Sequence, residues 1–124
     1  MKKILYSLIA LASLATLAFT FGDPLPIGSG MPKADLKMQD ISGKEVAMKD
    51  VKKENGVLVM FSCNTCPYVV KNQERTLAIS KFATKNKGGV IILNSNEALR
   101  ADEGSDAAMQ AYAKEQGYKW NYVV

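Results

Sequence analysis

The sequence predicts an α/β fold built around a strand–helix–strand unit. Residues 57–61 and 90–93 are unbroken apolar runs rich in β-branched residues, of the length expected for strands buried on both faces. Between them, residues 66–85 contain no Gly or Pro after Pro67 and repeat apolar residues at roughly helical spacing. This order implies parallel strands joined by one long helix, with 57–61 as the central strand.

The N-terminal segment 1–20 is typical of a cleavable export signal. Lys2 and Lys3 precede a run without charges, and Ala18 or Thr20 suits a small-residue cleavage site. The alternative is an uncleaved membrane anchor, because the run approaches the ~20 residues that span a bilayer. Its Ser and Thr residues favour cleavage, which predicts an exported protein in the periplasm or another extracytoplasmic space, soluble once the signal is removed.

The composition of the chain after this signal limits its domain organisation and its chemistry. Residues 21–33, rich in Pro and Gly, predict an extended lead-in, and 34–124 is long enough for one small domain. Without Lys2 and Lys3 the net charge falls from +4 to about +2, too little to predict a nucleic-acid partner, so the membrane is expected to matter only through the signal. The chain has no histidine, which excludes Cys-His and Ser-His catalysis and His-ligated zinc within it.

Local patterns predict the remaining elements. Alternating apolar residues around the turn signal Ser42-Gly43 predict a β-hairpin over 36–48. The polar stretch 94–104 predicts a loop, after which Ser105 is a helix N-cap and Gly117 the end of a second helix. Residues 120–124 are predicted to open another extended segment.

Cys63 and Cys66 form a Cys-x-x-Cys pair directly after a predicted strand and at the start of a predicted helix. In that setting the pair indicates redox chemistry. No third Cys and no His is present to complete a tetrahedral zinc site, so neither a metal nor another cofactor is predicted. A purely structural disulfide is the alternative, although so short a loop stabilises a fold by only ~2 kcal/mol or less.

Pro67 decides which cysteine begins the helix. If Cys63 were the N-cap, the proline ring would clash with the carbonyl of Cys63, at a cost of ~3 kcal/mol or more. With Cys66 as N-cap, Pro67 takes the first helical position, where no N–H is needed. The N–H groups of Tyr68 and Val69 then face the Cys66 sulfur and favour a thiolate. Cys66 is therefore the predicted nucleophile and Cys63 the resolving thiol.

Three further residues are predicted to support the dithiol. Thr65 is a candidate hydrogen-bond donor to the thiolate, with a plain turn residue as the alternative. Asn64, between the cysteines, and Tyr68, after the proline, complete the predicted site.

Residues 56–69, containing the run Cys63-Asn64-Thr65-Cys66-Pro67-Tyr68-Val69, resemble the thioredoxin-like redoxins of the alkyl hydroperoxide reductase and thiol-specific antioxidant branch. The polar residues 94–97 extend the resemblance. It implies a thioredoxin-like fold, antioxidant activity and disulfide exchange with protein thiols and a redox partner protein. Peroxidatic members carry Pro and Thr where this chain has Val59 and Cys63.

The resemblance also implies a proline loop beside the dithiol, and after it a final β-hairpin and helix. No proline comes after Pro67 in this chain. The expected fold is therefore a partial thioredoxin-like domain, with an N-terminal hairpin, a βαβ unit and a second helix, whose C-terminal ββα part is missing.

The sequence thus predicts a thiol-disulfide oxidoreductase that cycles Cys66 and Cys63 between dithiol and disulfide. One alternative is a thiol peroxidase in which Cys66 is oxidised to sulfenic acid and resolved by Cys63. Another is a carrier of Cu(I), bound by the two thiolates and Met60. Because parallel strands share their carboxyl edge, the loop after 90–93 is expected beside the dithiol.

Overall fold

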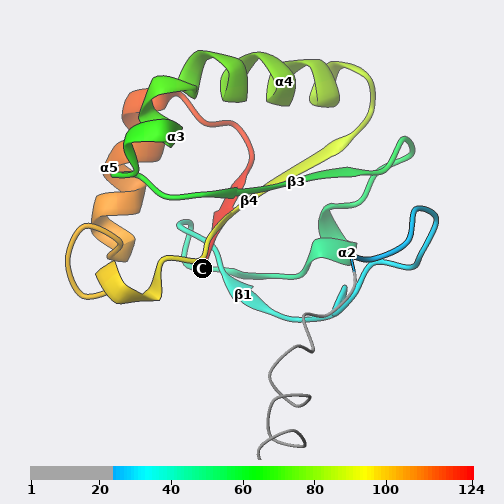
Figure 1. Ribbon diagram of the computed structural model, residues 1–124, viewed down its shortest axis with the longest axis horizontal. Coiled ribbons are helices and arrows are strands. Elements are labelled where there is room, and N and C mark those ends of the chain that lie inside the picture. The colour runs from blue at the N-terminus through cyan, green and yellow to red at the C-terminus, as the bar shows by residue number, and fades with distance from the viewer. Residues whose placement is uncertain (1–23) are drawn as a thin grey trace, which may run out of the picture. The chain divides into compact units, whose positions relative to one another are not determined.

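The computed structural model describes residues 24–124 (Figure 1). The predicted export signal and the first residues of the lead-in fall on 1–23 and lie outside the described residues. Residues 24–31 belong to one unit, in which the Ser29 N–H donates to the Pro26 carbonyl across a turn. Residues 32–124 form a second unit, which contains the dithiol. No helix in the described part of the chain is both long enough and apolar enough to cross a membrane.

The second unit contains both helices and strands (Figure 1). The strands are β1 (Met38–Gln39), β2 (Glu45–Val46), β3 (Val57–Ser62), β4 (Gly89–Asn94) and β5 (Asn121–Val123). The helices are α2 (Met48–Val51), α3 (Pro67–Lys71), α4 (Gln73–Lys85) and α5 (Asp106–Gln116), with a short 3₁₀ turn, η2 (Glu97–Leu99), between β4 and α5.

The main sheet is parallel, which confirms the predicted α/β class. Its strand order is β3-β4-β5, and the register places Ser62 beside Asn94. The hairpin of β1 and β2 joins the far side of β5, where Gln39 and Val124 exchange backbone hydrogen bonds of 3.1 and 3.0 Å. The carboxyl ends of β3 and β4 therefore lie together, as predicted from the direction of the strands.

The prediction that 57–61 forms the central strand is wrong. In the described residues β4 is central, with Val90, Ile91 and Ile92 buried, whereas β3 pairs on one side only and buries none of its residues. Phe61, near the end of β3, is 72% exposed. A continuous apolar run indicates that both faces of a strand are buried, but it does not indicate which segments pack against them or pair with the strand.

The predicted hairpin is shorter than its alternating pattern. Met48 does not extend β2 but begins α2. The Asp50 carboxylate explains this, because it accepts a hydrogen bond of 3.2 Å from the Ala47 N–H and so caps the first turn of a helix. Lys37 adds a 3.1 Å ion pair to the same carboxylate.

The predicted long helix is two helices. It breaks at Asn72, whose backbone (φ −101°, ψ 12°) leaves the helical region. The Asn72 side chain donates a 2.8 Å hydrogen bond to the Tyr68 carbonyl, and such side-chain bonds to the backbone compete with the helical pattern. The apolar stripe predicted for this helix is also only partly buried, because Val70, Ile79 and Phe82 are exposed.

The boundaries of α5 and the start of β4 depend on local chemistry. The Ser105 hydroxyl accepts a hydrogen bond of 3.4 Å from the Ala108 N–H, and Gly117 ends α5 with φ 70°, which confirms the predicted caps. Gly89 is the first residue of β4, and a Cβ there would lie 1.9 Å from the Val51 carbonyl oxygen. Only glycine allows α2 to approach β4 this closely.

The core cluster lies between the sheet and α5. Its buried residues are Ile92, Met109, Ala113 and Tyr122. Beside it the buried amide of Gln73 accepts hydrogen bonds from the hydroxyls of Tyr112 (3.0 Å) and Tyr118 (3.3 Å). Figure 1 shows α4 running along one side of the sheet, with α2 on the opposite side.

We expect the protein to lose stability at alkaline pH through this tyrosine cluster. Burial raises the pKa of Tyr112 to about 12. An unfolded chain ionises tyrosine near pH ~10 and so binds fewer protons than the native state above that pH. The free energy of unfolding should hold below pH ~10 and fall as the pH rises towards 12. Urea unfolding at pH 9 and pH 11 measures this fall, and Tyr112→Phe should make it smaller; an equal fall in both proteins would contradict the assignment.

Candidate functional site: a dithiol at the carboxyl edge of the sheet

The two cysteines lie where β3 ends and α3 begins. Cys63 comes directly after the last residue of β3, and Cys66 is the N-cap of α3 with extended backbone (φ −68°, ψ 122°). Pro67 takes the first helical position, as the proline argument predicts. The cysteines form a disulfide, with their Cα atoms 5.5 Å apart. The end of β3 and the start of α3 therefore hold the two cysteines within disulfide distance.

The two sulfurs differ in their surroundings. Cys63 is buried, with 4% of its surface exposed, whereas Cys66 is partly exposed. An outside thiol or disulfide therefore reaches Cys66 more readily than Cys63. In this disulfide form the Cys66 side chain accepts no hydrogen bond from the first turn of α3. The expected contact with the N–H groups of Tyr68 and Val69 thus remains a prediction for the reduced protein.

A second loop meets the dithiol from β4. Asn94, buried at the end of β4, accepts a 3.2 Å hydrogen bond from the Asn96 N–H through its side chain, which turns the chain out of the sheet. The loop then returns, and the Asn64 side-chain amide donates a hydrogen bond to the Glu103 carbonyl. Asn64 thus ties the turn between the cysteines to the loop before α5.

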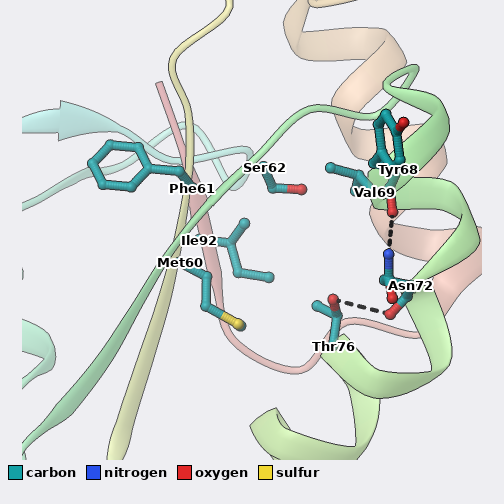
Figure 2. A pocket seen from close by; sticks show the side chains of 8 residues that line it. All are labelled: Met60, Phe61, Ser62, Tyr68, Val69, Asn72, Thr76 and Ile92. Carbon is teal, nitrogen blue, oxygen red and sulfur yellow. Dashed lines mark hydrogen bonds between the residues drawn. The ribbon is translucent and has the colours of Figure 1, made fainter.

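A pocket of 340 Å³ opens between the end of β3 and the two helices α3 and α4 (Figure 2). Its lining consists of Met60, Phe61, Ser62, Tyr68, Val69, Asn72, Thr76 and Ile92. In Figure 2 the Ser62 side chain points towards the helices, while the ring of Phe61 points away from them. The Ser62 hydroxyl is covered but has no hydrogen-bond partner within the described residues. The pocket therefore has a mostly apolar lining and lies at the end of β3, the strand that Cys63 follows.

The other predicted residues lie at or near the dithiol. Thr65 is exposed in the turn between the cysteines, and Tyr68 is 82% exposed beside Pro67. Met60, the third ligand of the copper alternative, packs against the core cluster around Ile92.

The sequence did not identify Ser62, which lines the pocket, or the backbone carbonyl of residue 103, which accepts the hydrogen bond from Asn64. Ser62 resembles the ordinary polar end of an apolar strand, and Glu103 is one of several charged residues in a loop. A backbone carbonyl has no signature in the sequence, because every residue has one.

No known protein-family model matches the sequence. Solved structures do match the fold. An uncharacterized conserved protein from Geobacillus kaustophilus superposes with a TM-score of 0.72 at 27% identity, over 82% of this chain and 53% of its own. A hypothetical protein from Sinorhizobium meliloti 1021 does so with a TM-score of 0.67 at 27% identity, over 80% of this chain and 54% of its own.

A third match has a described fold and activity. It is the thioredoxin domain of a thiol-disulfide oxidoreductase from Bacteroides vulgatus, with a TM-score of 0.59 at 20% identity, over 81% of this chain and 64% of that domain. This chain therefore has a thioredoxin-like fold. It spans about half the length of the first two structures that it matches.

Proposed function

We propose that this protein is a thiol-disulfide oxidoreductase whose redox centre is the Cys63–Cys66 pair. One observation carries the proposal: in a thioredoxin-like fold, the disulfide joins a buried cysteine to a partly exposed one, and the partly exposed cysteine is the N-cap of a helix. A disulfide with only a structural role needs no such difference in access.

The two sulfurs have separate tasks in the proposed reaction. The Cys66 thiolate attacks one sulfur of a partner's disulfide, forms a mixed disulfide and releases the first partner thiolate. The Cys63 thiolate then attacks the Cys66 sulfur, which expels the second partner thiolate and closes the Cys63–Cys66 bond. Two electrons and two protons pass to the partner, and the reverse sequence oxidises it.

Protein thiols and disulfides, including those of a redox partner protein, are the proposed substrates. Phe61 and Tyr68 are 72% and 82% exposed and flank the dithiol in sequence, and the apolar pocket lies beside it. Large exposed apolar side chains around a reactive group are typical of surfaces that contact other proteins. Export through the N-terminal segment, as the sequence predicts, would place the dithiol where disulfides persist.

We also propose that β3 pairs with a further strand in a complete redoxin-like domain. Within residues 24–124, β3 has a partner on one side only, and the exposed apolar residues Ile79 and Phe82 of α4 line a pocket beside β3. An added strand would satisfy the backbone groups of β3 and cover these side chains. This arrangement agrees with the C-terminal ββα part that the sequence resemblance implies.

Disulfide exchange by the reduced protein tests the proposed function. We expect it to reduce a protein disulfide such as those of insulin and to accumulate its own Cys63–Cys66 disulfide in equal amount. Consumption of a hydroperoxide much faster than that of the protein disulfide would instead support the peroxidase, and tight binding of one Cu(I) with slow exchange would support the carrier. A dithiol that exchanges no disulfide, consumes no hydroperoxide and binds no Cu(I) would contradict all three.

A further inference from the structure

One side chain connects the turn between the cysteines to a distant segment of the chain. Asn64 lies between Cys63 and Cys66, and its amide donates a hydrogen bond to the Glu103 carbonyl, 39 residues further along the chain. The cysteines on either side are fixed by the end of β3 and the start of α3. Asn64 therefore restrains the part of the dithiol that neither secondary-structure element controls.

The loop that contains the acceptor is closed by its own backbone hydrogen bonds. The N–H groups of Asp102 and Gly104 both donate to the Leu99 carbonyl, at 3.0 and 2.8 Å, and close the loop on itself. Gly104 is buried, and a Cβ there would lie 2.9 Å from the same Leu99 oxygen. The chain then enters the capped first turn of α5 at Ser105. The hydrogen bond from Asn64 to the Glu103 carbonyl thus connects the dithiol turn to a loop that is closed by its own hydrogen bonds.

We propose that Asn64 is a positioning residue for the dithiol, acting through the Glu103 carbonyl. It holds the turn in the geometry of the closed disulfide, so that Cys63 stays within reach of a mixed disulfide on Cys66. This inference rests on the proposed function. Its chemical consequence is a higher effective concentration of Cys63 at the Cys66 sulfur, which favours both ring closure and release of the partner.

The redox equilibrium with glutathione measures this effect. Asn64→Ala removes the amide, and Asn64→Leu keeps the branched shape of the side chain but lacks the donor. We expect both variants to lower the equilibrium constant for disulfide closure about fivefold, the worth of a typical hydrogen bond. This corresponds to a potential about 20 mV less negative, at about 30 mV per tenfold change. The mixed disulfide with glutathione should also persist longer in both.

Glu103→Gln is the matched control, because it removes the carboxylate but leaves the carbonyl in place. We expect it to keep the equilibrium constant of the natural protein. The inference fails if Asn64→Leu has the same equilibrium constant for disulfide closure as the natural protein. It also fails if Glu103→Gln shifts the potential as much as Asn64→Leu does. If the natural protein itself reaches no redox equilibrium with glutathione, the proposed function fails instead.

Discussion

Replacing Cys66 with alanine is expected to abolish disulfide exchange, while replacing Cys63 leaves a protein that reacts once and stops. Cys66 is the partly exposed cysteine at the N-cap of α3, and Cys63 is 4% exposed. Without Cys66 no mixed disulfide forms, and we expect the rate to fall to the background of the assay. Without Cys63 the mixed disulfide forms but cannot be resolved. Mass spectrometry of each variant after mixing with a disulfide substrate distinguishes these outcomes.

Alkylation of the same two variants tests the reason for the difference. Near pH 7 we expect the protein that retains Cys66 to react with iodoacetamide at least about ten times faster than the one that retains Cys63. Access and a lowered thiol pKa at the N-cap both contribute, and the pH dependence of the rate separates them. Faster alkylation of Cys63 would show that the assignment of nucleophile and resolving thiol is reversed.

Residues 22–124 are expected to be only marginally stable as an isolated chain. The edge of β3 next to the dithiol is unpaired in the described residues, and Phe61 and Phe82 are 72% and 67% exposed. A domain has a net stability of only ~5 to 15 kcal/mol, so an uncovered strand and helix face removes a large share of it. We expect urea unfolding with a low midpoint and weak cooperativity, and aggregation through the open edge.

A variant with a charged residue on β3 tests whether this strand causes the aggregation. Phe61→Lys should reduce aggregation and leave the far-ultraviolet circular dichroism unchanged, because Phe61 points away from the helices (Figure 2). A sharp, cooperative transition with a high midpoint in the natural sequence would show that the described elements already form a complete domain. It would also contradict the proposal that β3 pairs with a further strand.

Much of the redox site can be predicted from adjacent residues. Pro67 fits the first turn of a helix and not its interior, so it places Cys66 at the N-cap whatever the rest of the chain does. Ser105 and Gly117 mark the ends of α5 for equally local reasons, a side-chain acceptor and a left-handed backbone. The helix break at Asn72 was missed because an asparagine within a helical pattern bonds either to solvent or to the preceding turn.

The sequence by itself determined the α/β class, the parallel direction of the first two main strands and the register of the dithiol on its helix. These depend on hydrophobic periodicity and on the covalent geometry of proline, which act over a few residues. Only the tertiary structure decided that β4 lies between β3 and β5 in the described residues, that Cys63 is the buried cysteine, and that Asn64 donates a hydrogen bond to the Glu103 carbonyl. Each of these depends on which distant segment packs alongside, and an apolar run or a backbone carbonyl accepts many partners equally well.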